Sequence, residues 1–487
     1  MRKLQKRVVA LVSFLVLGII SSLGLVVGLG LPAARSEEFS IQSSRRPNIV
    51  FVLTDDQMPG TENRMTALQN NVEREGVKFS NTVSTYPLCC PGRAIIQRGQ
   101  YPHNTKIYGN SLPAGGWAKF RNLGEYQSTI ATWLNNSGYQ TGLFGKYMNN
   151  YRDRLIPPGW DRWYAWNGAK EGWSSVNDQG HVSPLDRHNA DVLVAKEAEK
   201  FLDARMAKRA PVFAFVNFGA MHSPYFSSKI DDKKFRGVGV PRTPAFNEDD
   251  VSDKNIRIRK LSMLSRSQIS DLDSQYRRGL RSLQRVDRFI ADASGILRRH
   301  HEMDNTYFVF YTDNGAHFGQ HRLRHGKLQP YEEDINFPLI VRGPGIPHGE
   351  VRNGLVGSHD IAPTLADMGN AQTPSFVDGR SVLPLANGTI TSWPRTTILS
   401  EQELDPDLPP LWGALRMQGQ KYIRFANGDK EYYDPGNDPY EVHSNPDSVD
   451  QITRSYWEQR LDDLQQCEGS SCRTAENVPV LSSTAKP

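Results

Sequence analysis

Short apolar runs that end in polar residues recur along the chain. Four of them stand out, "PNIVFVLTDDQ" (47–57), "PVFAFVNFGAMH" (211–222), "NTYFVFYTDNG" (305–315) and "FPLIVRGPG" (337–345). Each is rich in β-branched and aromatic residues and lacks the apolar–polar alternation of a half-exposed strand. Such runs are typical of strands that are buried on both faces, as in a parallel sheet.

Stretches with helical spacing lie between these runs. Residues 65–75 suit a helix that returns along the sheet, and apolar residues recur at helical spacing from Tyr276 to Leu297. This alternation predicts an α/β fold with a large, mostly parallel sheet flanked by helices. Because ligands gather at the carboxyl ends of strands in such sheets, we expect the functional residues there.

The pattern changes from about residue 380. Short strand-like pieces and turn signals in "KYIRFANGDKEYYDPGNDPYEVHSNP" predict a small antiparallel sheet in a C-terminal subdomain, residues 380–472. Residues 450–466 suit a closing helix, and residues 473–487 are expected to form a flexible tail. Residues 227–260 are charged and interrupted by Pro and Gly, so we expect a long surface excursion near the site.

The N-terminal segment, residues 1–35, begins with basic residues and continues with an uncharged apolar run from Val8 to Leu31. This order predicts export, either secreted, periplasmic or anchored outside the cytoplasm. The run is long for a signal peptide and suffices to span a bilayer, so a cleaved signal and a retained anchor are both open, with cleavage favoured. A membrane is a partner only if the segment is retained. Residues 36–46 are polar and form a predicted linker.

The net charge of the chain gives no support to a nucleic-acid partner. The formal net charge is +5, but residues 1–35 contain five basic residues and no acidic ones. The remainder of the chain is therefore neutral overall, whereas nucleic-acid binding proteins usually carry an excess of basic residues.

The four cysteines fall into two pairs. Cys467 and Cys472 close a short loop, and in an exported protein this spacing predicts a local disulfide. Cys89 and Cys90 are adjacent, and adjacent residues rarely reach disulfide geometry. They are either a buried structural pair or include one thiol with a chemical function.

Oxygen-bearing side chains follow two of the predicted strands. Asp55 and Asp56 end the first strand, and Asp313 and Asn314 end the third. Adjacent carboxylates are costly unless a cation compensates them, so a Ca²⁺ site, or a Mg²⁺ site, is the economical hypothesis. The alternative is that both pairs are ordinary turns.

Several basic side chains also follow predicted strands. They are Lys146, His222, His317 and Lys327. Taken singly, each such residue is more often a surface or core residue than a functional one. What is unusual is that several of them fall just after predicted buried strands, where side chains converge.

The segment "CCPGR" (89–93) resembles the signature of the formylglycine-dependent sulfatases. The resemblance extends in order through "CCPGRAIIQRGQYPHN", "GKYMNNY", "IPPGW", "HSP", "NTYFVFYTDNGAHFGQH", "FPLIVRGPG", "HDIAPTLADMG" and "YYDPGNDPYEVHSN", from about residue 46 to 466. The pieces "CCP", "PHN" and "PPGW" are most similar to the branch of N-acetylglucosamine-6-sulfatases, extracellular heparan sulfatases and bacterial arylsulfatase-like proteins. The resemblance implies the alkaline-phosphatase-like sulfatase fold, with residues 47–379 as catalytic domain.

This resemblance also implies a cofactor and a cation. The first cysteine, Cys89, would be oxidised to formylglycine by a formylglycine-generating enzyme during maturation. The implied ligands of a divalent cation, usually Ca²⁺, are Asp55, Asp56, Asp313, Asn314 and the modified Cys89. Cys90 would be a small packed residue.

Four basic residues match catalytic positions of the family. Arg93 would steady the modified side chain, Lys146 and Lys327 would contact the sulfate, and His222 would lie near the leaving-group oxygen. One hydroxyl of hydrated formylglycine would attack sulfur, and the second would later expel sulfate. An ordinary serine, with one hydroxyl, lacks that route.

Two positions are implied to bind substrate and two depart from the family. His317 and Asn149 are the implied substrate-binding residues. Gly92 stands where the family often has Ser or Ala, which puts the efficiency of the cysteine modification in question. Met148 stands where many sulfatases have a histidine, so proton transfer falls on His222 and the lysines.

The resemblance implies hydrolysis of sulfate esters, on sulfated sugars such as 6-sulfated N-acetylglucosamine. Two alternatives stay open at this point. A phosphonate monoester or phosphodiester hydrolase could use the same scaffold and the same modified cysteine. A protein with an unmodified cysteine could bind sulfated glycans without catalysis.

Overall fold

The computed structural model describes residues 45–167, 174–208, 210–402 and 412–481. The predicted export segment and most of the predicted linker therefore lie outside the described residues. No helix among the described residues is long and apolar enough to cross a membrane.

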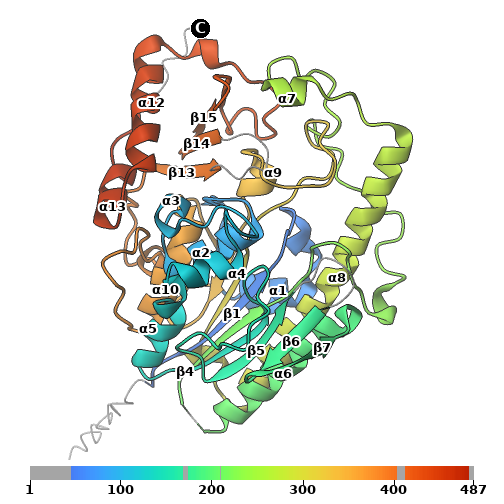
Figure 1. Cartoon of the computed structure of the whole chain (residues 1–487), viewed down its shortest axis with the longest axis vertical. Coiled ribbons are helices and arrows are strands. Elements are labelled where there is room, and N and C mark those ends of the chain that lie inside the picture. The colour runs from blue at the N-terminus through green and yellow to red at the C-terminus, as the bar shows by residue number, and fades with distance from the viewer. Residues whose placement is uncertain (1–44, 168–173, 209, 403–411, 482–487) are drawn as a thin grey trace, which may run out of the picture. The chain divides into compact units, whose positions relative to one another are not determined.

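A large mixed sheet forms the centre of the larger part of the chain (Figure 1). In spatial order its described strands are β11 (Glu350–Arg352), β2 (Val77–Phe79), β10 (Leu339–Arg342), β9 (Thr306–Thr312), β1 (Asn48–Thr54), β8 (Val212–Asn217), β4 (Gln140–Lys146), β5 (Arg162–Asn167), β6 (Ser174–Asp178) and β7 (His181–Leu185). The five strands from β9 to β5 run parallel, and β10 and β6 join this parallel core in antiparallel orientation. The mostly parallel α/β fold is confirmed.

Helices cover both faces of this sheet. On one face they are α1 (Thr66–Leu68), α6 (Ala190–Met206) and α8 (Arg266–Arg299), and on the other α2 (Cys89–Arg98), α4 (Gly116–Asn122), α5 (Ile130–Asn136), α10 (Ile361–Met368) and α11 (Leu383–Ala386). The short helices α3 (Pro102–Thr105), α7 (Ile256–Arg259) and α9 (Glu332–Ile335) lie elsewhere, and α7 and α9 share a buried cluster with the C-terminal sheet. A two-stranded sheet, β3 (Thr82–Val83) with β12 (Val356–Gly357), lies beside them. The predicted helix over 65–75 is α1, continued by a π-helical segment.

Strand β1 shows why the apolar runs do not alternate with polar residues. Val50 and Val52 lie in one buried cluster with residues of α6 and α8. Ile49, Phe51 and Leu53 point the other way, into a cluster with residues of α2, α5 and α10. Because successive side chains of a strand face opposite sides, a strand covered on both sides needs apolar residues at every position.

The predicted C-terminal antiparallel sheet is confirmed. Its strands are β13 (Thr397–Gln402), β14 (Trp412–Met417), β15 (Gln420–Phe425) and β16 (Lys430–Tyr433). Helix α12 (Gln451–Gln465) packs on one face through residues such as Trp457 and Leu461. The other face packs against residues from the larger part of the chain, because Ile423 and Ala414 share a buried cluster with Tyr331.

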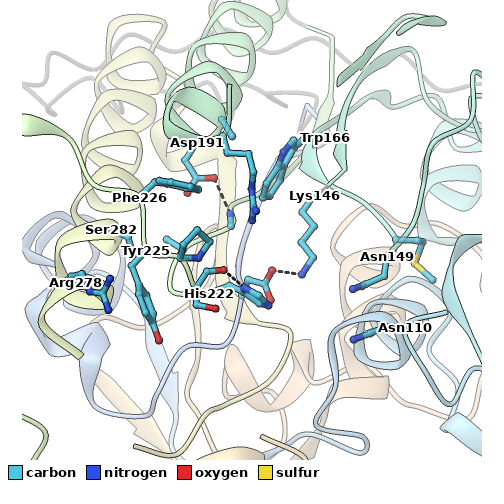
Figure 2. A pocket seen from close by; sticks show the side chains of 18 of the residues that line it. Asn110, Lys146, Asn149, Trp166, Asp191, His222, Tyr225, Phe226, Arg278 and Ser282 are labelled. Atoms are coloured by element: carbon cyan, nitrogen blue, oxygen red, sulfur yellow. Dashed lines mark hydrogen bonds and ion pairs between the residues drawn. The ribbon is translucent and has the colours of Figure 1, made fainter. Parts of the chain in front are cut away.

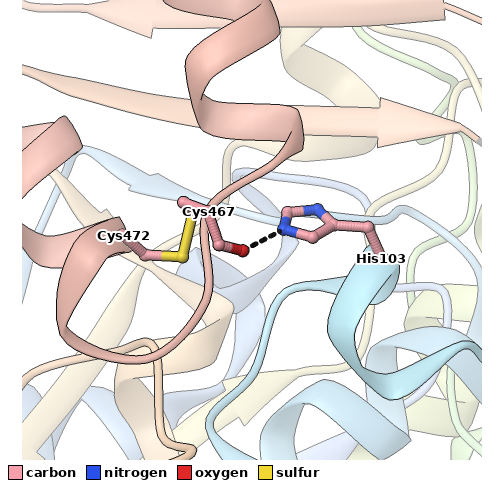
Figure 3. A group of neighbouring side chains, drawn as sticks. All are labelled: His103, Cys467 and Cys472. Atoms are coloured by element: carbon pink, nitrogen blue, oxygen red, sulfur yellow. Dashed lines mark hydrogen bonds between the residues drawn. A yellow bond between two sulfur atoms is a disulfide. The ribbon is translucent and has the colours of Figure 1, made fainter.

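The end of the chain differs from the predicted flexible tail. Helix α13 (Ser470–Glu476) covers the first residues of that tail, and the carboxylate of Glu476 is fully buried. Cys467 and Cys472 form the predicted disulfide. Figure 3 shows His103 beside it, with Nε2 at 3.0 Å from the carbonyl oxygen of Cys467. Since both thiols are consumed in the disulfide, this group cannot ligate a metal ion.

The segment 227–260 is less exposed than its composition predicts. Val251 and Ile258 are buried in the cluster beneath the C-terminal sheet. The side chain of Lys254 is fully buried, and its Nζ donates to the carbonyl of Val442 at 3.0 Å. This excursion therefore packs against the C-terminal subdomain, where charged residues are held by ion pairs.

Candidate active site

The predicted site residues come together at the carboxyl ends of the central strands. Asp55 and Asp56 follow β1, and Asp313 and Asn314 follow the neighbouring β9. The backbone holds the first pair firmly, because the N–H of Asp55 donates to the carbonyl of Ala220 at 2.8 Å. The parallel arrangement of β9, β1 and β8 thus explains why three distant segments share one site.

Cys89 lies in the first turn of α2 and is almost completely buried. Its Sγ is 3.5 Å from an Asp55 carboxylate oxygen, 3.8 Å from one of Asp56 and 2.7 Å from Nζ of Lys327. Burial, followed by the charge of Asp55, raises the pKa of the thiol to about 12. An unmodified Cys89 would therefore stay protonated at neutral pH and be a poor nucleophile.

Two lysines neutralise the aspartate pair. The ammonium of Lys146 bonds Asp55, and that of Lys327 bonds Asp56. Burial acts to raise the pKa of both carboxyl groups, but Lys146 beside Asp55 and Lys327 beside Asp56 outweigh it and hold both pKa values below their ordinary range. The two ammonium groups therefore offset the charge of the buried aspartate pair.

Arg93 is buried and contacts residues at four strand ends. Its Nε donates to Asp313 at 2.9 Å, and its Nη1 donates to the carbonyl of Lys146 at 2.9 Å and to Oδ1 of Asn217 at 3.2 Å. Its Nη2 is 3.6 Å from Asp55. A guanidinium has the fixed fork of donors that such multiple bonding requires, so Arg93 orients the residues around Cys89.

The oxygen-bearing side chains fit a divalent cation. Burial, followed by the charge of Asp55, raises the pKa of Asp313 to about 7, which reflects three carboxylates in one buried place. Asn314 donates Nδ2–H to Asp56 at 2.7 Å, whereas its buried Oδ1 has no hydrogen-bond partner among the described residues. An unpartnered amide oxygen beside carboxylates is a donor set suited to Ca²⁺ or Mg²⁺.

His222 lies at the rim of this cluster (Figure 2). Its Nε2 is 3.5 Å from Asp56, and its Nδ1 is 2.5 Å from the carbonyl oxygen of Ser223. Since a carbonyl only accepts, Nδ1 carries a proton and Nε2 faces the reacting centre. The imidazole is 38% exposed, so a substrate can reach it.

A cavity of about 900 Å³ opens beside these residues. Asp55, Lys146 and His222 are among the residues that line it, and Figure 2 shows Lys146 and His222. Asn149 lies in its wall, and Oδ1 of this residue is buried without a hydrogen-bond partner in the described part of the chain. Met148 also lines the cavity, and its thioether accepts from Gln97 rather than offering a proton.

His317 is placed differently from Asn149. Its Nδ1 is 2.8 Å from Asp334, and its backbone forms two hydrogen bonds with Gly326. It is buried below the loop that leads to Lys327 and is not among the described residues that line the cavity. Its structural contacts thus position Lys327, and a substrate contact of His317 stays a prediction.

Gly92 and Cys90, the neighbours of Cys89 in the motif, are both tightly packed. A Cβ on Gly92 would lie 2.7 Å from the carbonyl oxygen of Asp313, so the first turn of α2 packs closely against the cation-site loop. Cys90 is fully buried in the apolar cluster on its face of the sheet. Burial raises the pKa of its thiol to about 11, which leaves it chemically inert.

The sequence did not reveal several residues that line the cavity. Among those labelled in Figure 2 they are Asn110, Trp166, Asp191, Tyr225, Phe226, Arg278 and Ser282. Asp191 is half-buried and accepts the N–H of Gly219 at 2.8 Å, which fixes the turn that leads to His222. These residues come from loops, helices and strand β5 without a shared motif, so only their position in space identifies them.

Comparison with known proteins places the chain and its fold among relatives. The family model described as Sulfatase matches residues 47–371, and the model described as N-sulphoglucosamine sulphohydrolase, C-terminal, matches residues 319–466. Among solved structures, one in complex with its substrate D-glucosamine-2-N,6-O-disulfate has a TM-score of 0.73 at 22% identity, covering 89% of this chain and 99% of that one. A phosphonate monoester hydrolase from Silicibacter pomeroyi has a TM-score of 0.62 at 18% identity, covering 86% and 96%.

Curated relatives match over most of the chain. The N-acetylglucosamine-6-sulfatase of Capra hircus is 29% identical, over 89% of this chain and 86% of its own length. The arylsulfatase of Volvox carteri is 30% identical, over 88% and 76%. The extracellular sulfatase SULF-1 homologue of Drosophila melanogaster is 34% identical, over 72% of this chain but only 32% of its own length, and the Caenorhabditis elegans homologue is matched over 56% of its length. On the family model and these relatives together, the chain belongs to the sulfatase family.

Proposed function

We propose that the protein hydrolyses sulfate esters with a nucleophile made from Cys89. The observation that carries this proposal is the position of Cys89, with Sγ 2.7 Å from Nζ of Lys327 and beside Asp55 and Asp56, of which Asp55 also lines the cavity. The pKa of about 12 argues against the thiol itself as nucleophile. Conversion of Cys89 to formylglycine resolves this conflict, because the hydrated aldehyde supplies one hydroxyl to attack sulfur and another to expel sulfate.

A divalent cation, Ca²⁺ or Mg²⁺, is part of the proposal. Asp55, Asp56, Asp313 and Asn314 would hold it, together with the modified side chain at position 89. When bound, such a cation lowers the pKa of a coordinated hydroxyl and offsets the charge of the sulfate oxygens. Lys146 and Lys327 would then exchange their carboxylate partners for the sulfate oxygens, and thereby stabilise the charge that develops during transfer.

His222 would provide the proton for the departing alcohol. Its Nδ1 is fixed on the carbonyl of Ser223, which leaves Nε2 directed to the site. Among the described residues that line the cavity, His222 is the histidine, and Met148 has no proton to transfer. We expect His222→Gln to lower kcat about 100-fold on a sulfated sugar, whose alcohol leaves poorly, and far less on nitrophenyl sulfate. An equal loss on both substrates would assign His222 another role.

The substrate class that fits best is a sulfated sugar. The cavity has hydrogen-bonding groups such as Asn110 and Asn149 beside Trp166, and sugars are bound by this combination of polar and aromatic side chains. The relatives named N-acetylglucosamine-6-sulfatase favour 6-sulfated N-acetylglucosamine. The disulfide and the relatives named extracellular sulfatases favour export of the chain.

Comparison of rates on an aryl sulfate and an aryl phosphonate tests the reaction. We expect the sulfate to be the faster substrate by orders of magnitude. The phosphonate monoester hydrolase with the same fold makes the opposite preference the specific alternative, and dominant phosphonate turnover would overturn the proposal. A panel of defined sulfated saccharides, assayed for released sulfate, then identifies the preferred sugar.

Intact-mass analysis of the peptide that contains Cys89 tests the modification. Formylglycine lowers the mass relative to the thiol, and Cys90 in the same peptide is expected to stay a thiol. An unmodified Cys89 in the native, exported protein would favour a glycan-binding protein without catalysis.

A further inference from the structure

We propose that His321, Glu333 and Glu441 form a second divalent-cation site, suited to a borderline transition-metal ion such as Zn²⁺. One donor atom of each residue lies within 4.8 Å of the other two. The site is separate from the cluster around Cys89 and joins three segments: the loop after β9, helix α9 and the loop after β16. The proposal does not depend on the proposed function.

His321 supplies the observation that points to a ligand. Its imidazole is fully buried, and Nε2 has no hydrogen-bond partner among the described residues. Its Nδ1 lies 2.7 Å from a carboxylate oxygen of Glu248, to which it donates. Burial, followed by the charge of Lys254, lowers the pKa of His321 to about 3, so the imidazole is neutral and Nε2 carries a free electron pair.

The surroundings of His321 match those of a metal-binding histidine. Such a histidine commonly donates its second ring N–H to a carboxylate, which fixes the ring and makes the other nitrogen a better ligand. Glu248 has this position, and Lys254 holds it in turn with Nζ at 3.2 Å. The ring of His321 also packs on Tyr331, with 4.2 Å between centroids, so its orientation is fixed before any ion binds.

The two glutamates supply charge that the surroundings compensate only in part. Glu441 is fully buried and accepts the N–H of Glu332 at 2.8 Å, with Lys421 at 2.5 Å from its other oxygen. The carboxylate of Glu333 forms no ion pair with a described residue. Burial, followed by the charge of Glu441, raises the pKa of Glu333 to about 8. A cation between the two carboxylates would remove this repulsion.

The donor set selects the class of ion. One imidazole nitrogen with two carboxylate oxygens suits Zn²⁺ and similar transition-metal ions, whereas Ca²⁺ prefers oxygen ligands throughout. The second site would therefore differ in metal preference from the oxygen-rich cluster at Asp55 and Asp313. Its position predicts a structural role, because a bound ion would tie α9 and the preceding loop, which carries Lys327, to the C-terminal subdomain.

Zinc stoichiometry of the full-length protein tests this proposal. The chelator-treated wild-type chain and its variants are dialysed against Zn²⁺, and bound zinc is measured by elemental analysis. We expect Glu333→Gln and His321→Gln to bind one ion fewer than the wild-type chain. Glu248→Gln should weaken this ion about 10- to 100-fold through loss of the carboxylate that orients His321. Glu75→Gln, an exposed glutamate, is the matched control.

A thermal melt provides the second measurement. Zn²⁺ should raise the melting temperature of the wild-type chain and of Glu75→Gln by more than that of Glu333→Gln. Glu333 is half-buried, so its replacement by Gln should leave the fold intact. Equal zinc content in the wild-type chain, Glu333→Gln and His321→Gln overturns the proposal, whatever the active site binds. A wild-type chain that binds no zinc overturns it as well.

Discussion

Two buried charge clusters of this molecule look alike and differ in one decisive respect. The active-site cluster surrounds Cys89, and a second cluster, here called the closing cluster, consists of His359, Asp360, Arg395 and Glu476. In the closing cluster Arg395 bonds both carboxylates, and His359 contacts Glu476 at 2.8 Å. All four side chains of the closing cluster are completely buried.

The difference lies in access, not in the pKa shifts. Burial acts to raise the pKa of Glu476, but Arg395 and His359 outweigh it and lower the pKa, as the lysines do for Asp55. The active-site cluster, however, opens to a cavity that Asp55, Lys146 and His222 line. A perturbed carboxylate therefore marks an ion-pair network in both places and a functional site in only one.

Replacement of the nucleophile gives the largest expected effect. Cys89→Ser should lower kcat/KM by about 10⁴-fold or more, since a single hydroxyl cannot replace the modified side chain. The control Cys90→Ala should keep most of the activity, because Cys90 packs in the apolar cluster. Steady-state kinetics on an aryl sulfate measure both variants, and similar losses would mean that the two cysteines are not distinguished as we propose.

Loss of Arg395 should affect stability rather than chemistry. Arg395→Leu leaves Asp360 and Glu476 buried without their shared partner, at a cost of about 3–5 kcal/mol in the free energy of unfolding. Arg121→Leu, which breaks the exposed pair with Asp153, should cost less than about 1 kcal/mol. Urea denaturation measures both, and a change in kcat of the folded Arg395→Leu protein would contradict the distinction between the clusters.

The dependence of stability on pH should show that Glu476 stabilises the fold through its charge. Its folded pKa is lowered from the ordinary 4.5, so its ionised form stabilises the fold above that pH and loses this effect as pH falls toward the folded pKa. Glu476→Gln should therefore be less stable than the wild-type chain at pH 7. The difference should shrink below about pH 4.5 in urea melts at a series of pH values. A constant difference across this range would show that the lost contact is not the ionic one.

Two glycines give the smallest and most local test. Gly92→Ala places a Cβ 2.7 Å from the carbonyl of Asp313 and should cost about 1–3 kcal/mol, with reduced activity because the cation-site loop shifts. Gly295→Ala adds a Cβ on α8 with only the end of Arg299 at 4.0 Å, and should stabilise by roughly 0.5–1 kcal/mol. Thermal melts of both proteins, with activity assays of Gly92→Ala, measure the contrast.

The central strands and the groups at their ends were predictable from sequence for one physical reason. A strand buried on both faces is mostly apolar, so the charged residues Asp55 and Asp313 mark the positions just after β1 and β9. Parallel order then brings these positions to one edge. The motif around Cys89 added the chemical role that polarity alone does not supply.

Other parts of the site and fold have no such signal. Asp191 and Arg278 look like ordinary surface residues of long helices, and only tertiary packing places them around the cavity. Glu476 lies in a polar sequence typical of a flexible end, yet its charge is compensated by residues far away in the chain. His317 has the spacing of a substrate ligand but is held by Asp334, which local sequence does not reveal.

The position of Glu476 also sets an order of events during synthesis. Tyr101, which lies just after α2, donates its hydroxyl to Glu476 at 2.6 Å across a separation of 375 residues. Until α13 has been synthesised, Arg395 and His359 have no access to this carboxylate. A nascent chain that stops short of α13 therefore has Asp360 as the remaining acidic partner of Arg395 in the closing cluster, and its fold lacks the contacts of Glu476.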